Sequence, residues 1–224
     1  MHPTLDVLLT GGRDASCRVW DMRTRTQVHI LTGHESAVSS VLANATDPQV
    51  VTGSMDSTVR TWDLAAGKVR TVLTHHKKGV RALAGHAREF AFVSAGADAL
   101  KRWALPDCTL VHGYAEHAPG RIVNALALNA DGVLAAGGDD GSLQLWDYGT
   151  GHCFQSAQSR AQPGSLDAEA GIFAAAFDAT GSRLVTAEAD KTIKIWKEDA
   201  AATPETHPID EKAWGDYCRA FRRY

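Results

Sequence analysis

The chain has 224 residues, of which 44% are hydrophobic and 22% are charged, a composition typical of a folded globular protein. Its formal net charge of −3 argues against a surface built to track nucleic-acid phosphates. The sequence contains no run of about 18 apolar residues, so it predicts no membrane span. Its start does not resemble a secretory signal. The cysteines are scattered without a Cys-x-x-Cys pair, which favours reduced thiols in a cytosolic or nuclear protein. They are Cys17, Cys108, Cys153 and Cys218.

Runs of β-branched and aromatic residues, separated by polar turns, predict strands from residue 5 to residue 197. The first expected group lies near Val7–Thr10, Cys17–Trp20 and Gln27–Leu31, and the second near Ala37–Leu42, Val50–Gly53, Thr58–Trp62 and Val69–Leu73. The third lies near Val80–Ala84, Phe90–Ser94, Ala99–Trp103 and Thr109–Gly113, and the fourth near Ile122–Leu128, Val133–Ala136, Ser142–Trp146 and His152–Ser156. The fifth lies near Phe173–Phe177, Arg183–Thr186 and Thr192–Trp196.

One pattern recurs in every group: a strand, a polar turn containing Asp, and a second strand that ends on Trp. The Asp precedes the Trp by six residues in four copies and by five in the third. The tryptophans at 20, 62, 103 and 146 recur every 41–43 residues, and 50 residues separate the last two, at 146 and 196. A period of about 40–45 residues with Trp-Asp endings is the signature of a WD-repeat β-propeller. Gly33-His34 supplies the Gly-His half of that signature, His76 and His117 are weaker copies, and the fifth group has no His.

The sequence therefore predicts an all-β, WD40-type β-propeller with four near-complete blades and a partial one, as part of a seven-bladed ring. We assign residues 1–197 to this incomplete propeller and residues 198–224 to a C-terminal tail, which is either poorly ordered or a partner-binding element. An insert from about Gln158 to Gly171 accounts for the long last spacing, and loops of that length are usually functional or disordered. Because the first group begins late, we expect the chain to be a fragment or an N-terminally truncated form.

The repeated His, Ser or Thr, Asp and Trp could be interpreted as a nucleophilic triad. A nucleophile is needed once per active site, however, whereas this set recurs from blade to blade, so we interpret it as a structural hydrogen-bond relay to the Trp indole. The relay and its partial copies comprise His34, Thr52, Asp56, Trp62, His76, Ser94, Asp98, Trp103, Asp14, Trp20, Asp140, Trp146, Asp190 and Trp196. The fourth blade has Ala136 at the Ser/Thr position and the fifth lacks the His, so we expect packing to hold these two blades.

No catalytic residue, metal site or cofactor is expected. The histidines lack metal-ligand spacing, and the paired glycines fall inside the repeat as turn glycines rather than in a phosphate loop. Function should then lie on the surfaces, where the residue before each turn Asp and the start of each innermost strand reach the rim. The candidates for partner contact at this rim are Arg13, Arg81, Asn124 and Asp139.

Four runs carry a resemblance beyond the general repeat. They are Val50–Ser54, Leu31–His34, Gln162–Leu166 with Glu169–Phe173, and Glu188–Lys194. They closely resemble the pleiotropic regulator family, and the likeness extends over nearly all of residues 2–210; the Gln-Pro-Gly-Ser-Leu insert is the more specific signal. Members of that family look like seven-bladed propellers behind a long N-terminal extension. The resemblance implies a nuclear, non-enzymatic scaffold in pre-mRNA splicing, a subunit of the spliceosomal NineTeen-associated complex with protein partners and only indirect RNA contact.

Two alternatives stay open. The run Trp20-Asp21-Met22-Arg23 is similar to the motif by which some WD proteins dock on the adaptor of cullin-based ubiquitin ligases, which would make Arg23 a partner contact and the chain a substrate receptor. The third possibility is a WD scaffold of an unrelated complex. None of the three interpretations involves a membrane or a small-molecule substrate.

Overall fold

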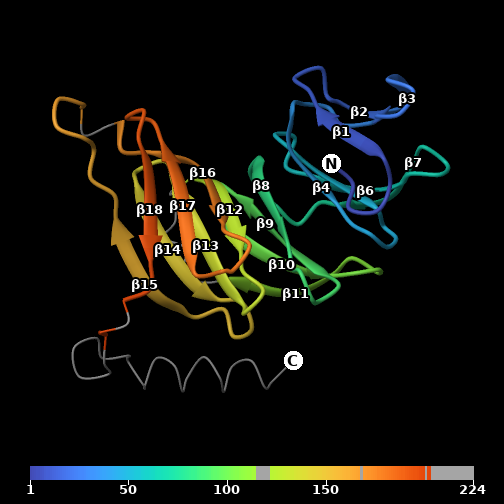
Figure 1. Cartoon of the computed structure of the whole chain (residues 1–224). Coiled ribbons are helices and arrows are strands. Elements are labelled where there is room, and N and C mark those ends of the chain that lie inside the picture. Colours follow the sequence, from blue (N-terminus) through green and yellow to red (C-terminus); the bar gives the residue numbers. More distant parts are fainter. Residues whose placement is uncertain (115–121, 167–168, 200, 203–224) are drawn as a thin grey trace. The chain divides into compact units, whose positions relative to one another are not determined.

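The computed structural model describes residues 1–114, 122–166, 169–199 and 201–202, and in these it contains eighteen strands in five antiparallel sheets (Figure 1). The first sheet contains β1 (Val7–Gly11), β2 (Ser16–Asp21) and β3 (Thr26–Thr32). The second contains β4 (Val38–Ala43), β5 (Val50–Ser54), β6 (Val59–Asp63) and β7 (Lys68–Leu73). The third contains β8 (Val80–Gly85), β9 (Ala91–Gly96), β10 (Leu100–Ala104) and β11 (Thr109–Tyr114).

The fourth sheet contains β12 (Val123–Leu128), β13 (Val133–Gly138), β14 (Ser142–Asp147) and β15 (Cys153–Gln158). The fifth contains β16 (Ile172–Phe177), β17 (Arg183–Glu188) and β18 (Ile193–Lys197). Each sheet is a meander in which consecutive strands pair. Every predicted strand has a counterpart within a few residues, so the predicted all-β class is confirmed, and the repeated meanders are consistent with a β-propeller. Within the described ranges, no helix is long and apolar enough to cross a membrane.

The chain forms two compact units. Unit 1 comprises Met1–Gly113 with a short stretch that ends at Val123, the first residue of β12, and unit 2 comprises the residues from Asn124 onward together with Tyr114 and its neighbours. The predicted boundary between propeller and tail stays a prediction, because residue 200 and residues 203–224 lie outside the described residues.

The core of each unit lies between neighbouring sheets, because alternate side chains of a strand point to opposite faces. In unit 1, Val59 of the second sheet lies in one buried cluster with Phe92 and Trp103 of the third. A second cluster joins the first sheet to the second through Cys17 and Trp62. In unit 2, small side chains of the fourth sheet pack against the fifth in a cluster that includes Leu143, Ile172 and Leu184.

The hairpin turns explain the spacing between Asp and Trp. Where the spacing is six, the residue after the turn Asp has a positive φ: 60° at Ala15, 68° at Ser57, 80° at Gly141 and 67° at Lys191. The turn Asp stabilises this left-handed residue by accepting hydrogen bonds from the residue that lies two positions after the Asp itself. The third sheet has one residue fewer between Asp98 and Trp103, and none of the residues in its turn has a positive φ. The missing residue is thus the left-handed one.

Candidate functional site

The relay predicted for the second sheet is assembled in full. The indole Nε1 of Trp62 donates to Thr52 Oγ1 at 2.8 Å, and this hydroxyl lies 2.7 Å from His34 Nε2. The other ring nitrogen, His34 Nδ1, lies 2.9 Å from Asp56 Oδ2. Strand β5 places the Thr, and the neighbouring strand β6 places the Trp, which pairs with Val50 two residues before the Thr. The connection from β3 to β4 brings in the His. Asp56, in the turn of the β5–β6 hairpin, is the last member of the relay.

The third sheet repeats this geometry with Ser in place of Thr. Trp103 Nε1 donates to Ser94 Oγ at 2.8 Å, and Ser94 Oγ lies 2.7 Å from His76 Nε2. His76 Nδ1 lies 2.8 Å from Asp98 Oδ1, and Lys101 Nζ approaches the other carboxylate oxygen at 3.5 Å. The edge of the His75 ring also contacts Trp103, with ring centroids 5.1 Å apart.

Burial and hydrogen bonding set the charges of the two relays. Burial is the largest influence on the pKa of His34 and His76 and lowers both, although the neighbouring carboxylates act in the opposite direction. Burial raises the pKa of Asp56, but hydrogen bonds from Thr58, His34 and the Glu35 amide outweigh it and hold that pKa at about 2. The pKa of Asp98 is likewise about 2. At neutral pH a neutral imidazole thus donates from Nδ1 to an ionised carboxylate and accepts at Nε2 from the hydroxyl.

The first and fourth sheets hold only parts of the relay. Trp20 Nε1 donates to Thr10 Oγ1 at 3.0 Å in a partly exposed position, while Asp14 binds Arg18 at 2.6 Å rather than a histidine. In the fourth sheet, Asp140 accepts from Ser142, and Trp146 Nε1 is buried without a hydrogen-bond partner among the described residues.

Aromatic packing supports Trp146 in place of the missing hydroxyl. The Tyr114 ring meets the indole edge to face, with centroids 5.7 Å apart, and the Tyr114 hydroxyl donates to the Tyr148 carbonyl oxygen at 3.4 Å. This arrangement agrees with the expectation that packing holds the fourth sheet. His117, the weaker copy of the relay histidine, lies outside the described residues.

The same expectation is wrong for the fifth sheet, because a different polar network takes the place of the histidine. Trp196 Nε1 donates to Thr186 Oγ1 at 3.0 Å, and this hydroxyl lies 3.4 Å from Glu188 Oε1. The buried Glu188 carboxylate binds Lys194 Nζ at 2.5 Å and Ser159 Oγ at 2.6 Å. A Glu two residues before the turn Asp thereby supplies the acceptor that a His supplies elsewhere.

The fifth-sheet network also fixes the start of the insert. The Gln162 amide N–H donates to Asp190 Oδ2 at 2.9 Å, and its side chain donates to the Asp190 carbonyl oxygen at 2.8 Å. Lys194 Nζ lies 3.9 Å from Asp190 Oδ2 and also donates to the Arg160 carbonyl oxygen. Asp190 and Trp196 therefore belong to one network but are not directly bonded. The described part of the insert is held by side chains of the hairpin β17–β18.

The burial and the hydrogen bonds of the relay hydroxyls make catalysis by these groups difficult. Thr52 and Ser94 are fully buried, and each hydroxyl is already shared between an indole N–H and an imidazole. A nucleophile must approach its substrate, and these oxygens face the interior of a sheet stack. In the described part of the chain, no three His, Cys, Asp or Glu side chains form a group that could hold a metal ion. Cys17, Cys108 and Cys153 are free thiols, and Cys218 lies outside the described residues.

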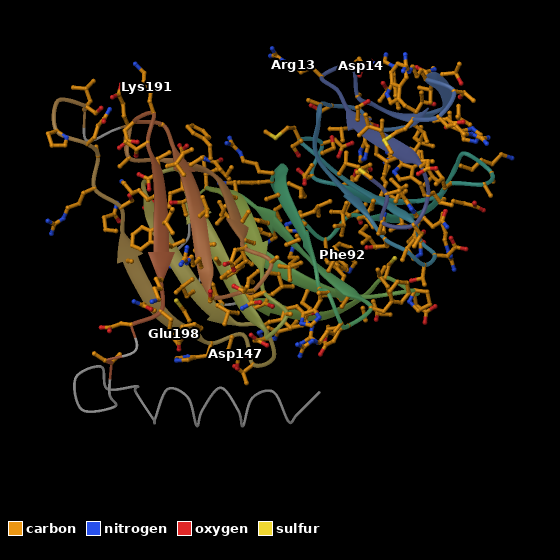
Figure 2. The ribbon with its side chains drawn as sticks, in the orientation of Figure 1. Arg13, Asp14, Phe92, Asp147, Lys191 and Glu198 are labelled. Carbon is orange, nitrogen blue, oxygen red and sulfur yellow. The ribbon has the colours of Figure 1, made fainter. Side chains whose placement is uncertain are left out.

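The candidates for partner contact lie at the hairpin ends of the sheets. Arg13 is exposed in the β1–β2 turn, and Figure 2 shows it with Asp14 at the tip of that hairpin. Arg81 follows the first residue of β8, beside the β9–β10 turn, where the Ala97 amide donates to the Gly79 carbonyl oxygen at 3.3 Å. In unit 2, Asn124 Nδ2 donates to Asp139 Oδ1 at 2.9 Å, so these two candidates form one polar surface.

Arg23 lies in the β2–β3 turn, at the opposite end of the first sheet from Arg13. Its backbone N–H donates to Asp21 Oδ1 at 2.8 Å. Asp63 and Asp147 accept from the same kind of turn in the second and fourth sheets. The repeat pattern did not lead us to predict these caps, although the Asp that follows Trp in Trp-Asp was a signal for them. In unit 2, Figure 2 shows Asp147 and Glu198 at one end of the strands and Lys191 at the other.

Comparison with known proteins identifies the repeat and some relatives. The family model described as WD domain, G-beta repeat matches residues 1–21, 25–63, 108–147 and 161–197. The matched ranges omit most of the third sheet, which nevertheless assembles the same relay as the second. Protein pleiotropic regulator PRL2 of Arabidopsis thaliana is 57% identical over 125 residues, 56% of this chain and 26% of that protein.

Two further relatives are similar at the same level. Pleiotropic regulator 1 of Homo sapiens is 51% identical over 56% of this chain and 24% of that protein. Pre-mRNA-splicing factor PRP46 of Eremothecium gossypii is 52% identical over 54% of this chain and 28% of that protein. The resemblance to pleiotropic regulators is confirmed over about half of the chain, and the matched part spans about a quarter of each relative. Since the repeat model covers more than half of its residues, the chain belongs to the WD-repeat family.

Proposed function

We propose that this chain is a non-enzymatic protein-interaction scaffold in pre-mRNA splicing, acting in the nucleus as a subunit of the spliceosomal NineTeen-associated complex. The observation that supports this function most directly is its 52% identity over 120 residues to a protein named Pre-mRNA-splicing factor. The WD repeats and the names of the relatives indicate a scaffold-type protein. The relay geometry supports the same interpretation, because its hydroxyl and imidazole groups are occupied by bonds inside the sheets.

The hairpin ends of the sheets are the surfaces that we assign to partners. Arg13 and Arg81 on unit 1 offer guanidinium groups, which are enriched among the residues that dominate binding energy. On unit 2, Asn124 and Asp139 offer a donor and an acceptor held together by their own hydrogen bond. With a net charge of −3, the chain is better suited to protein surfaces than to RNA, so contact with RNA should be indirect.

Affinity purification of the tagged chain from nuclear extract tests this function. We expect splicing proteins and small nuclear RNAs to co-purify, and the proteins to stay bound after ribonuclease treatment if RNA contact is indirect. The double variant Arg13→Glu with Arg81→Glu should lose partners while keeping the circular dichroism spectrum of a folded chain. Thr26→Glu is a matched control, because Thr26 is exposed at the opposite end of the first sheet. Recovery of neither splicing proteins nor small nuclear RNAs above the tag-only background would refute the proposal.

A second candidate function is a substrate receptor of a cullin-RING ubiquitin ligase. The observation that favours it is that Arg23 is exposed in a turn fixed by Asp21, so its side chain can reach a partner. This function predicts that Arg23→Ala loses binding to the ligase adaptor without unfolding. An adaptor pull-down that is equal for Arg23→Ala and the unsubstituted chain would eliminate it, and this result would leave the splicing function untouched.

A further inference from the structure

The connections that lead into the second and third sheets differ in charge. Each begins directly after its relay histidine: Glu35–Ala37 reads Glu-Ser-Ala, and Lys77–Gly79 reads Lys-Lys-Gly. The first amide N–H of each connection donates to the turn Asp of its own sheet, at 3.1 Å from Glu35 and 3.0 Å from Lys77. The two lysines and the glycine therefore change the surface of the third sheet without changing how the connection is held.

The two lysines carry positive charge that their own sheet does not neutralise. Lys77 and Lys78 are exposed, and among the described residues neither ammonium group has an ion-pair partner. The turn carboxylate of the third sheet, Asp98, is already shared between His76, the Lys77 amide and Lys101 Nζ. Both ammonium groups are consequently left to solvent or to a partner.

An apolar side chain lies next to the residue that follows the two lysines. Met55, in the β5–β6 turn, is 42% exposed. A Cβ placed on Gly79 would lie 3.2 Å from Met55 Cε and 3.1 Å from Met55 Cα, which is closer than most side-chain contacts. Glycine thus makes room for the methionine, a flexible residue that is common at surfaces that bind varied partners. We call the surface of Met55, Lys77, Lys78 and Gly79 the Lys-Met surface.

We propose that the Lys-Met surface binds an acidic segment of a protein partner, with an apolar side chain of that segment packed on Met55. The carboxylates of the segment face the two ammonium groups, so charge and shape are both matched. The surface lies where the second and third sheets meet, and neither is the first or the last sheet in the sequence. The proposal rests on the proposed scaffold function and names the kind of partner that this part of the hairpin ends binds.

The charge around the Lys-Met surface favours a protein segment over RNA. Glu35 is exposed in the neighbouring connection, and the whole chain has a net charge of −3, so the positive charge is local. Proteins that track a nucleic-acid backbone do so with an extended basic groove. Two adjacent lysines beside a methionine suit a short run of carboxylates that includes one apolar residue.

Selection from a display library of short random peptides tests the proposal without a known partner. Peptides are kept if they bind the unsubstituted chain and discarded if they also bind the double variant Lys77→Glu with Lys78→Ser. This variant gives the third sheet the Glu-Ser pair of the second sheet, where the relay is complete, so it should keep the circular dichroism spectrum of a folded chain. We expect the remaining peptides to be rich in Asp and Glu around an apolar residue.

Fluorescence polarisation of one selected peptide measures the size of the effect. The double lysine variant should bind it about tenfold more weakly, and added salt should reduce the difference. Lys68→Glu with Arg70→Ser is the matched control, because it makes the same change in charge. Both of these residues are exposed at the start of β7, whereas the Lys-Met surface lies beyond the end of that strand. The control variant should bind like the unsubstituted chain.

Met55→Ser tests the apolar half of the surface and does not depend on the folding of the lysine variant. It should weaken binding of the selected peptide, but not of a peptide in which Ser replaces the apolar residue. Equal losses for the two peptides would overturn the contact with Met55. The proposal as a whole is overturned if no peptide survives the selection, if the survivors are not acidic, or if the matched control loses as much affinity as the lysine variant. Tighter binding of single-stranded oligouridylate than of the selected peptide at the same surface would assign it to RNA instead. None of these measurements uses splicing proteins, so this proposal and the splicing function can fail separately.

Discussion

Thr52→Val tests the relay most directly. The two side chains have nearly the same shape, so the substitution removes the hydroxyl and little else. In the second sheet this hydroxyl accepts from Trp62 Nε1 at 2.8 Å and lies 2.7 Å from His34 Nε2. All three side chains are buried, so no solvent is at hand to replace the lost partner. The change therefore leaves two polar atoms of the interior unsatisfied.

The size of the effect follows from those two atoms. A buried polar group that loses its partner costs about 1–3 kcal/mol, so with two such atoms the loss in the free energy of unfolding should be about 2–6 kcal/mol. Thr10→Val is the matched control in the same unit. Thr10 also accepts from a Trp, at 3.0 Å from Trp20 Nε1, but it is exposed and water can replace it. Its substitution should cost less than about 0.5 kcal/mol.

Urea unfolding followed by tryptophan fluorescence measures both variants, at one fixed protein concentration. The circular dichroism spectra of the folded chains should be unchanged. The reasoning is refuted if Thr52→Val is as stable as the unsubstituted chain, or if the exposed Thr10→Val change costs as much. Either result would mean that the hydroxyl of the relay contributes nothing beyond ordinary packing.

Three further predictions follow from the other sheets and from pH. Ala136→Ser would place a hydroxyl near the unpartnered Trp146 Nε1, so thermal unfolding should show unit 2 stabilised by about 1 kcal/mol; an unchanged midpoint would show that the serine does not reach the indole. Lys194→Met would leave Glu188 buried without its cation, and urea unfolding should show a loss of about 3–5 kcal/mol, whereas a loss below about 1 kcal/mol would contradict the role of the pair. The relay histidines have a pKa below 6.5 in the folded chain. The unfolded chain therefore binds more protons, and stability should be complete above pH 6.5 and fall as pH drops below it. The turn aspartates add to the loss below their unfolded pKa of 3.8. Urea midpoints that are equal at about pH 7.5 and about pH 5.5 would contradict the histidine shifts.

The local patterns of the sequence were sufficient for the fold class and for the two complete relays. Strand and turn signals depend on neighbouring residues, so they can be recognised without knowing the tertiary structure. The relay in the second sheet also follows from the repeat, since His34, Thr52 and Asp56 recur at nearly constant spacing in the third. The Asp caps of the turns after Trp20, Trp62 and Trp146 were missed, although the Asp of each Trp-Asp pair was a signal for them, because the groups that they bind are backbone amides.

What the sequence by itself determined is therefore whatever recurs with the repeat: the strands, the hairpin turns, and the His, Ser or Thr, Asp and Trp of the second and third sheets. Tertiary structure alone decided which contacts replace the relay in the sheets that depart from the repeat. In the fifth sheet, the contact of Ser159 with Lys194 joins residues 35 positions apart and supplies a network where the histidine is missing. The position of Met55 against Gly79 was decided in the same way, because it joins the turn of one hairpin to the connection that leads into the next sheet. Such contacts are long-range, so the physical reason lies in the packing of sheets and not in any local pattern.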